Sequence, residues 1–348
     1  MRALVFREPW DLRVETRDDP RPGPGEVLVR VTATGICGSD IHGYTGENGR
    51  RHPGQIMGHE TVGRVHSAGD GVEIAPGTIV TVNPVIACGE CPACRRGAEQ
   101  TCHRRRVIGV TPDIVSAFAE YLLAPAGNVV ELPDTMPEEY GVLVEPLAVG
   151  YHAAQRGGCM SDDRVLVIGG GPIGQACVLA ARRIGVADVV VSEPSAARRE
   201  MVEALDARTL DPAACQMDAE VARILGEPAT LVLDAVGSSS SLGDATGSSA
   251  LGSRIVLVGM GAPRVELAAY AISTEERTLV GSFSYSAQEF RETAAWVGES
   301  PEELRHLVDG RVDIHGALDA FRDLGQGTSS ASKVLVFPHG VPPDGVGP

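Results

Sequence analysis

The sequence predicts an α/β fold with a doubly wound parallel sheet in the second half of the chain. The chain has 348 residues, a length typical of about two domains. Residues 165–185 have the pattern of a buried strand, a glycine-rich turn and an amphipathic helix. Apolar runs that end in turn residues recur at 187–193, 230–237, 254–261 and 278–286. Repeated alternation of strands and helices implies a parallel, doubly wound sheet.

The glycine-rich turn stands where a dinucleotide-binding site requires it. The β-branched run 165–168 leads into the sequence GGGPIG, which satisfies G-x-G-x-x-G between a strand and a helix. Gly169 allows the tight turn, Gly171 lets the backbone approach a pyrophosphate, and Gly174 permits close packing of helix on strand. Glu193, at the end of the next strand, is placed to bind ribose hydroxyls and to repel a 2′-phosphate. The sequence therefore predicts NAD, with NADP as the less favoured cofactor.

Other residues of this unit are candidates for cofactor contacts. These are Pro172, Ile173, Arg198, Val258 and Met260. Arg198 follows Glu193 closely, together with Arg199, so the two arginines can weaken the preference for NAD. Alternatively, Arg198 packs along the adenosine.

The composition excludes several classes of partner. The formal charge is −16, from 30 Lys and Arg against 46 Asp and Glu, so nucleic acid is not an expected partner. No apolar run reaches the roughly 20 residues of a membrane-spanning helix, and the start "MRALVFREPW" lacks the features of a secretory signal. We therefore expect a cytoplasmic protein without a membrane partner. In that compartment clustered cysteines bind metal more often than they form disulfides.

Four of the eight cysteines lie within residues 87–102. They follow the pattern C-x2-C-x2-C-x7-C and are Cys88, Cys91, Cys94 and Cys102. Four thiolates about 2.3 Å from one ion make a closed tetrahedral zinc site, which leaves no open position for chemistry. The alternatives are an iron–sulfur cluster or four independent cysteines. The pattern indicates a structural zinc lobe over about 87–103, with Arg95 and Arg96 offsetting the thiolate charge.

A second group of possible metal ligands is spread over the first half of the chain. Cys37 lies in "GICGSDIH", His59 and Glu60 lie in "MGHE", and Glu145 lies in "LVEPLAVGYH". Each residue alone is a weak signal, because single cysteines and histidines are usually structural. Together they have the composition of a catalytic zinc site with an open position.

Two residues near Cys37 have side chains suited to proton transfer. Ser39 can accept a proton from an alcohol beside the metal, and His42 can pass it to solvent because its pKa lies near neutrality. The plain alternative is a turn, since "GSD" is turn-forming and Asp40 can cap backbone amides. The sequence leaves both interpretations open for Asp40.

Taken together, these motifs resemble the zinc-dependent medium-chain dehydrogenase/reductase superfamily of the alcohol dehydrogenase type. The resemblance covers nearly the whole chain. It rests on "PGPGEVLVRVTATGICGSDIH", the "GHE" box, the four-cysteine lobe, "AFAEYLLAP", "EPLAVGYHA", "VLVIGGGPIG" and "KVLVFP". The motif around Glu145 is similar to the polyol, butanediol and threonine dehydrogenase branch. The ethanol enzymes have a cysteine ligand at that place.

The resemblance implies an architecture of two domains. A GroES-like, mainly β catalytic domain is expected over 1–146, and a Rossmann domain over 147–285. Residues 286–348 are expected to return to the catalytic domain and to end in a flexible tail. The resemblance also implies an active site in the cleft between the domains, and a homotetramer or homodimer.

The resemblance further implies roles for the site residues. Cys37 and His59 are expected zinc ligands, while Glu60 and Glu145 are one ligand and one nearby carboxylate, in an order that stays open. Ser39 matches the proton-accepting hydroxyl and His42 the relay histidine. With the structural ion, two zinc ions per chain are expected.

Two segments depart from the family pattern. Residues 237–256 are rich in Ser and Gly where relatives carry an Ala- and Leu-rich helix, so a weak helix is expected there. The tail segment "GRVDIHGALDAF" looks shorter than in relatives, which leaves substrate choice and oligomeric state in doubt.

The predicted activity is NAD- and zinc-dependent interconversion of a secondary alcohol and its ketone. A polyol, sugar alcohol or cyclitol is the expected substrate class, with L-threonine or another hydroxy amino acid as the alternative. A non-catalytic NADH-binding protein on the same fold is a rival from another class. A zinc-free reductase is disfavoured because both ligand sets are present. Tyr44, Phe118 and Tyr285 are pocket candidates by position, and plain packing explains each equally well.

Overall fold

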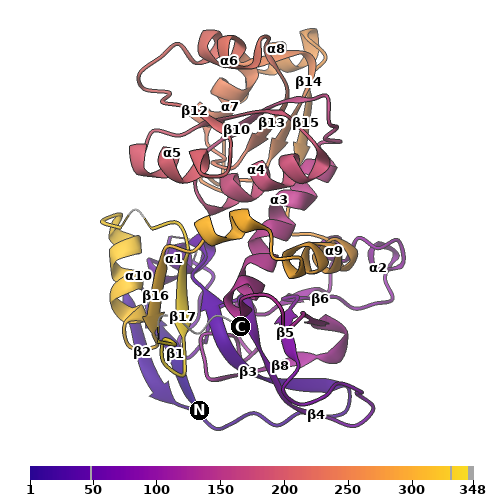
Figure 1. Ribbon diagram of the computed structural model, residues 1–348, viewed down its shortest axis with the longest axis vertical. Coiled ribbons are helices and arrows are strands. Elements are labelled where there is room, and N and C mark those ends of the chain that lie inside the picture. Colours follow the sequence, from indigo (N-terminus) through magenta and orange to yellow (C-terminus); the bar gives the residue numbers. More distant parts are fainter. Residues whose placement is uncertain (48, 330, 344–348) are drawn as a thin grey trace. The chain divides into compact units, whose positions relative to one another are not determined.

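In the computed structural model the chain forms two compact units, which are described separately here (Figure 1). The first unit comprises Met1–Glu145 and Ser286–Pro348, and the second comprises Pro146–Tyr285. The structure describes residues 1–47, 49–329 and 331–343. The end of the predicted flexible tail, residues 344–348, lies outside the described residues. None of the described helices is long and apolar enough to cross a membrane.

The second unit is built on a six-stranded sheet with the order β12-β11-β10-β13-β14-β15. Its strands are β10 (Arg164–Ile168), β11 (Asp188–Ser192), β12 (Arg208–Leu210), β13 (Ala229–Asp234), β14 (Ser249–Leu257) and β15 (Thr278–Gly281). Every pairing in the sheet is parallel. The chain starts at β10, moves to one edge, and returns to β13 on the other side of β10. The predicted doubly wound sheet is confirmed, and its strand order reverses between β10 and β13, where ligands of such sheets bind.

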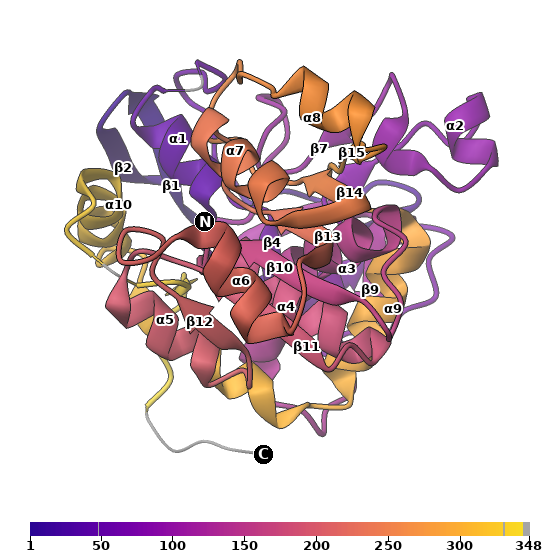
Figure 2. The same cartoon turned by 90° about the horizontal axis from the view of Figure 1, so that it is seen from above.

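Helices cover this sheet. They are α3 (Val144–Arg156), α4 (Pro172–Ile184), α5 (Ala196–Glu203), α6 (Met217–Leu225), α7 (Ser239–Gly247) and α8 (Ala269–Thr274). Helices α6 and α7 lie side by side (Figure 2), and both contribute buried side chains to one core with β10 and β13. Val165, Leu166 and Val167 are fully buried, as expected for a central strand covered on both faces.

The serine-rich segment forms a better helix than its composition predicts. Helix α7 begins after Ser238, whose hydroxyl accepts from the backbone N–H of Ser241, while the Ser241 hydroxyl accepts from the N–H of Ser238. This reciprocal cap satisfies two N–H groups that would otherwise have no partner. Leu242 and Ala245 are buried on its inner face. The expectation of a weak helix ignored the cap and the burial, which offset the poor helix propensity of serine and glycine.

The first unit is mainly β, as predicted. Its largest sheet has the order β16-β17-β3-β4-β5-β9, with β8 paired to β3, and two small sheets pair β1 with β2 and β6 with β7. The strands are β1 (Arg2–Glu8), β2 (Asp11–Thr16), β3 (Glu26–Gly35), β4 (Glu60–Ala68), β5 (Ile79–Val82), β6 (Val85–Ile86), β7 (Arg106–Val107), β8 (Tyr121–Pro125), β9 (Val129–Glu131), β16 (Gly310–Asp313) and β17 (Val334–Phe337). The helices are α1 (Gly38–Tyr44), α2 (Pro92–Arg95), α9 (Ala287–Gly298) and α10 (Ala317–Gln326), with 3-10 turns η1 (Glu99–Thr101), η2 (Ala126–Asn128), η3 (Glu138–Leu143) and η4 (Glu302–His306).

The C-terminal segment returns to the first unit and lies beside β3 (Figure 1). Strand β17 pairs antiparallel with β3, and Leu335 lies opposite Gly35. The N–H of Ile36 donates to the carbonyl of Val334 at 2.9 Å. The start of β17 is therefore held beside the end of β3, where the residues around Cys37 follow.

The three aromatic pocket candidates are buried residues. Phe118 is fully buried, and its ring meets that of Phe321 edge to face, with 5.4 Å between centroids. Tyr44 packs in the same way against Phe321, at 5.6 Å. Tyr285 is also fully buried. Packing therefore explains these side chains, and they give no information about a substrate.

Candidate functional site

The four clustered cysteines converge as a tetrahedral metal site requires. They lie on the loop between β6 and β7 that carries α2. The Sγ of Cys94 is 3.5 Å from that of Cys91 and 3.8 Å from that of Cys88, and the Sγ atoms of Cys88 and Cys102 are 3.5 Å apart. Four sulfurs at about 2.3 Å from one zinc ion are about 3.8 Å from one another. The distances thus fit one ion and exclude disulfides, whose sulfurs are about 2.05 Å apart. They do not fit an iron–sulfur cluster, in which the four thiolates are shared between at least two irons and cannot all converge on one ion.

Local hydrogen bonds favour the thiolate form of two cysteines in this lobe, whereas burial raises the pKa of Cys94 to about 12. The backbone N–H of Glu90 lowers the pKa of Cys88 to about 6, and that of Cys94 lowers the pKa of Cys91. Arg104 donates to the Sγ of Cys88 at 3.2 Å. This arginine adds to Arg95 and Arg96, whose predicted role in offsetting the thiolate charge stays a prediction. Arg104 comes after the last cysteine, outside the segment in which a partner was sought.

The second predicted group of ligands also converges, within the first unit. Ligand atoms of Cys37, His59 and Glu60 all lie within 4.8 Å of one another. Cys37 lies between β3 and α1, two residues after the end of β3, while Glu60 is the first residue of β4. Strands β3 and β4 pair so that Gly35 lies opposite Glu60. The sheet register therefore brings together ligands that are more than 20 residues apart in the chain.

A buried carboxylate faces the histidine of this cluster. Asp40 is fully buried, and its Oδ1 lies 3.7 Å from Nδ1 of His59 and 3.6 Å from Nη2 of Arg51. Oδ1 of Asp40 and Nδ1 of His59 have no hydrogen-bond partner among the described atoms. A metal at the other ring nitrogen, Nε2, leaves Nδ1 protonated and directed at such a carboxylate. Asp40 also accepts from the N–H of Cys37 at 3.2 Å, so it both caps α1 and faces His59.

A lysine from the C-terminal segment completes the cluster. Lys333 is buried, and its Nζ donates to both oxygens of Glu60, at 2.7 Å to Oε1 and 2.5 Å to Oε2. Burial alone would lower the pKa of Lys333, but the carboxylate of Glu60 outweighs it and raises this pKa above its ordinary value. Lys333 is therefore a cation in the buried cluster.

Glu145, in the first turn of α3, is the fourth predicted ligand. It is partly buried and does not belong to the three-residue group within 4.8 Å. Its charge nevertheless acts on the cluster, because it raises the pKa of both His59 and Lys333. Glu145 thus lies close enough to interact with both residues.

The charges of the cluster match a divalent cation. Burial would lower the pKa of His59, but Asp40 and Cys37 raise this pKa well above its ordinary value. The surroundings of the imidazole are therefore strongly negative. The groups that are negative when ionised are Cys37, Asp40, Glu60 and Glu145, and the positive ones are Arg51 and Lys333. Unpaired charges are costly inside a protein, and an ion of charge +2 balances this group. The thiolate, imidazole and carboxylate donors are those that zinc prefers.

The two proton-transfer candidates both lie on α1. Ser39 is one turn ahead of His42, whose Nδ1 is 2.5 Å from Oε2 of Glu47. About half of the His42 side chain is exposed. His42 can therefore exchange protons with solvent, and Glu47 is an acidic partner that the sequence pattern did not suggest.

The glycine-rich loop has the geometry that its sequence predicts. Gly169 has φ 96°, a left-handed conformation that favours glycine. A Cβ at Gly174 would lie 1.8 Å from the carbonyl oxygen of Gly169, whereas one at Gly171 would meet nothing within 4 Å. Gly174 thus allows helix α4 to approach β10. Gly171 presents bare backbone at the start of α4, where Pro172 and Ile173 form its first turn.

Glu193 follows β11 directly and is anchored by two backbone groups. Its Oε2 accepts from the N–H of Gly170 at 2.7 Å and its Oε1 from the N–H of Ser195 at 2.8 Å. The carboxylate is thus tied to the glycine-rich loop. Arg199 donates to the carbonyls of Glu193 and Pro194, so its guanidinium group is bound to the backbone of this loop.

The remaining cofactor candidates differ in exposure. Arg198 lies in the first turn of α5 and is half-buried. Val258 follows β14 directly, and its N–H donates to the carbonyl of Asp234 at 2.9 Å. Met260 is largely exposed, at 64%. Val258 and Met260 both lie at the carboxyl end of β14, the edge of the sheet at which ligands bind.

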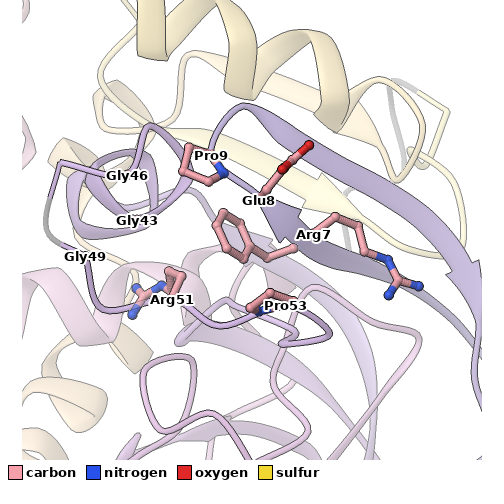
Figure 3. Close-up of a pocket in the computed structure, with 9 residues that line it drawn as sticks. Arg7, Glu8, Pro9, Gly43, Gly46, Gly49, Arg51 and Pro53 are labelled. Atoms are coloured by element: carbon pink, nitrogen blue, oxygen red, sulfur yellow. The ribbon is translucent and has the colours of Figure 1, made fainter.

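A cavity of about 170 Å³ in the first unit shares Arg51 with the metal cluster (Figure 3). Its lining residues are Phe6, Arg7, Glu8, Pro9, Gly43, Gly46, Gly49, Arg51 and Pro53. The guanidinium groups of Arg7 and Arg51 point to opposite sides, so its polar groups do not converge on one ligand. None of the predicted catalytic residues is among these lining residues.

Three residues of the cluster have no role in the sequence-based prediction of the site. The predicted site includes neither Arg51 nor Lys333, and it gives Asp40 only as a possible cap of backbone amides. A buried charged residue is rarely stable unless paired, but burial cannot be seen in a sequence. Lys333 lies in "KVLVFP", a motif used only to recognise the family, and the pairing of β17 with β3 brings it to Glu60.

Comparisons with known proteins agree with this geometry. Residues 23–134 match the family described as alcohol dehydrogenase GroES-like domain, and residues 172–299 match the family described as zinc-binding dehydrogenase. The chain is 32% identical to L-galactonate-5-dehydrogenase of Escherichia coli K12 over 302 residues, which cover 86% of this chain and 88% of that protein. It is 44% identical to L-threonine 3-dehydrogenase of Pyrococcus abyssi over 194 residues, or 55% of each chain.

A solved structure shares the whole fold. It is described as a short chain alcohol dehydrogenase (rspB) of E. coli CFT073 complexed with the cofactor NADH. The TM-score is 0.89 at 30% sequence identity, and the match covers 97% of this chain and 99% of that one. The predicted combination of a GroES-like domain with a Rossmann sheet is therefore confirmed.

Proposed function

The chain belongs to the zinc-type medium-chain dehydrogenases of the alcohol dehydrogenase superfamily, and on that basis we propose that it oxidises a secondary alcohol to a ketone with NAD. The observation that carries this proposal is the convergence of Cys37, His59 and Glu60, whose ligand atoms lie within 4.8 Å of one another as a metal site requires. A four-cysteine lobe alone would supply no chemistry, because its site is closed.

The residues of the cluster have distinct tasks in this reaction. Cys37, His59 and a glutamate would hold a zinc ion, which would supply a Lewis acid for the substrate oxygen. Ser39 accepts the proton of the alcohol, and His42, which is exposed and near Glu47, passes it to solvent. Asp40 orients the imidazole of His59 from the side away from the metal.

The second unit supplies the hydride acceptor. A bound NAD would supply the acceptor for the hydride of the carbon that bears the hydroxyl. Gly171 and the start of α4 receive the pyrophosphate, and Glu193 faces the adenosine ribose. The buried negative charge of Glu193 favours NAD over NADP, since a 2′-phosphate would be repelled.

For the substrate we propose a polyol or a sugar-derived alcohol. Support comes from the similarity over most of the chain to a dehydrogenase named for L-galactonate, which carries several adjacent hydroxyl groups. L-Threonine is the second candidate. The identity to a threonine dehydrogenase is higher, but it extends over only about half of each chain.

We further propose a cytoplasmic homo-oligomer. All eight cysteines are free thiols in the structure, and zinc thiolates are typical of reducing compartments. The edge strand β15, which pairs only with β14 among the described strands, supports self-association.

The test is NADH formation by the purified protein. We would supply NAD or NADP with a panel of aldonates, polyols, cyclitols, simple secondary alcohols and L-threonine, with and without a zinc chelator. The proposal expects chelator-sensitive turnover that is faster with NAD, and fastest with a polyhydroxylated substrate. Turnover that resists complete zinc removal would overturn it, and a clear preference for L-threonine would select the second candidate.

A further inference from the structure

The carbonyl of Gly170, in the glycine-rich loop, is bound by a side chain that lies outside the glycine motif. Nε2 of Gln175 donates to the carbonyl oxygen of Gly170 at 2.9 Å. Gln175 lies near the start of α4 and is only 1% exposed. Helix α4 cannot satisfy this carbonyl with its own backbone, because its N-terminal bond runs from the N–H of Gln175 to the carbonyl of Gly171. The side-chain amide of Gln175 therefore binds a carbonyl that the helix leaves out.

The N–H of Gly170 is bound as well, from the other side. Oε2 of Glu193 accepts from it at 2.7 Å, so both backbone polar groups of Gly170 have a side-chain partner. The helix that carries Gln175 is itself closely packed on α3. A Cβ at Gly150 of α3 would lie 2.5 Å from the carbonyl oxygen of Ala176. The amide of Gln175 thus reaches the loop from a fixed position.

The bond from Gln175 also determines where the next N–H points. The carbonyl of Gly170 and the N–H of Gly171 belong to one peptide group, and no peptide bond among the described residues is cis. In a planar trans peptide the C=O and N–H bonds point in opposite directions. Because the carbonyl is directed at the buried amide of Gln175, the N–H of Gly171 points away from it. This N–H donates to no backbone group among the described residues, and a Cβ at Gly171 would meet nothing within 4 Å.

We propose that Gln175 is a positioning residue for the cofactor, because its amide orients the peptide between Gly170 and Gly171 and so aims the N–H of Gly171 at the pyrophosphate. This inference rests on the proposed function, since it concerns the same cofactor. A loop of glycines has more conformational freedom than other loops of its length. With the peptide oriented in advance, less of that freedom is lost when the cofactor binds. The gain is confined to ligands that carry the pyrophosphate.

The experiment compares the full-length protein with Gln175→Met, Gln175→Glu and the control Gln155→Met. Methionine is similar to glutamine in length but has no N–H to donate. Gln155 is an exposed residue of α3, so the same substitution there leaves the loop unchanged. Calorimetry measures the binding of ADP-ribose, which contains the pyrophosphate, and of adenosine, which does not. Steady-state kinetics give kcat and the KM values for NAD and for the alcohol.

For Gln175→Met we expect an affinity for ADP-ribose that is lower by about tenfold, because one peptide group must now be ordered during binding. The affinity for adenosine should equal that of wild type. In turnover, the KM for NAD should rise by about tenfold, whereas kcat and the KM for the alcohol should not change. A general loosening of the fold would instead weaken the binding of both ligands. Gln155→Met should behave as wild type throughout.

Gln175→Glu tests the donated hydrogen bond itself. An ionised carboxylate cannot donate to the carbonyl of Gly170, whereas a protonated carboxyl group can. Burial raises the pKa of an introduced carboxyl group towards neutrality. We therefore expect this variant to bind ADP-ribose weakly at alkaline pH and as tightly as wild type at mildly acidic pH. Gln175→Met should remain weaker than wild type over the same range.

Two results would overturn the inference: a folded Gln175→Met protein with the wild-type affinity for ADP-ribose, or an equal loss of affinity for adenosine. If Gln175→Met does not fold, Gln175→Glu decides alone, because it keeps the shape of the side chain. An affinity of Gln175→Glu that stays low at every pH would then reject the role of the hydrogen bond. Failure of these variants to show the effect leaves the proposed function intact if the wild-type protein binds ADP-ribose and oxidises an alcohol. A wild-type protein that binds neither ADP-ribose nor NADH overturns both.

Discussion

Ser39 is the residue on which the proposed chemistry depends most and the fold depends least. It lies on the first turn of α1, two residues after Cys37. Its hydroxyl supplies the proton acceptor, whereas the architecture of the metal cluster comes from β3, β4 and β17. A substitution at this position therefore separates catalysis from metal binding.

We expect Ser39→Ala to lower kcat by about 10²- to 10⁴-fold, the usual contribution of a positioned acid or base. Zinc content, NADH binding and thermal stability should stay at wild-type values. Ser39→Thr, which keeps the hydroxyl, is the matched control and should retain most of the activity. Steady-state kinetics with metal analysis check this, and an unimpaired Ser39→Ala enzyme would remove Ser39 from the mechanism.

In the proposed mechanism, Glu193 sets the choice of cofactor through its charge. Glu193→Gln keeps the size of the side chain and one acceptor oxygen, but it removes the negative charge that repels a 2′-phosphate. We expect the ratio of kcat/KM with NAD to that with NADP to fall by at least about tenfold. Asp188→Asn is the control, because this exposed carboxylate lies at the far end of β11 and pairs with Arg208. An unchanged ratio in Glu193→Gln would show that another residue selects the cofactor.

At the residue scale, the sequence predicted the donors but not their charged neighbours. Cys37 and His59 stand in short motifs, so their chemistry is visible in the sequence. Lys333 is 273 residues from Glu60, and only the pairing of β17 with β3 brings the two together. The contact of Arg104 with Cys88 was not predicted for a related reason. The path of an irregular loop leaves no periodic pattern in the sequence.

At the scale of elements, the cysteine lobe has little hydrophobic core and little regular secondary structure to stabilise it. Its core consists of the cysteines and two alanines, and its helix α2 has only four residues. Metal binding must therefore contribute much of the free energy that orders it.

We expect Cys91→Ala to reduce zinc from two ions per chain to one and to expose residues 87–103 to proteolysis. The free energy of unfolding should fall by about 2 kcal/mol or more, which lowers Tm by at least about 4 °C. Calorimetry and metal analysis measure both effects. Cys215→Ala, which removes a thiol outside the lobe, is the control and should keep both zinc ions. A Cys91→Ala protein with two zinc ions would contradict the tetrahedral site.

Elements were predicted best where the hydrophobic periodicity agrees with the residues that begin or end a helix or strand. Strand β10, the glycine turn and helix α4 with its Gly185 cap follow directly from the sequence, because each has its own local signal. Helix α7 was underestimated, since reciprocal capping by Ser238 and Ser241 and burial of its apolar face outweigh its composition. The order β16-β17-β3 had no local signal, because pairing between distant strands is decided by tertiary packing.

At the scale of the whole molecule, the segment 236–283 of the second unit exposes many apolar side chains for a chain of charge −16. Seven large hydrophobic residues between positions 236 and 283 are exposed: Val236, Leu251, Met260, Leu267, Tyr270, Leu279 and Phe283. Strand β15 in the same segment is at the sheet edge and pairs only with β14 among the described strands. An open edge strand beside exposed apolar side chains is suited to pairing with a second copy of itself.

We therefore expect a homodimer or larger oligomer in light scattering, and a lower mass for Leu279→Lys, which places a charge on β15. Met160→Lys, another exposed apolar site outside the segment 236–283, is the control and should keep the wild-type mass. A monomeric wild-type protein at micromolar concentration would contradict the proposal, as would a Leu279→Lys variant of unchanged mass.

The most direct test of the central claim is the zinc content of Cys37→Ala, measured together with its turnover of the best substrate. Our account predicts one zinc ion per chain instead of two, no detectable NADH formation and a Tm close to that of wild type. Two zinc ions with normal turnover would show that the cluster of Cys37, His59 and the two glutamates is not the catalytic centre.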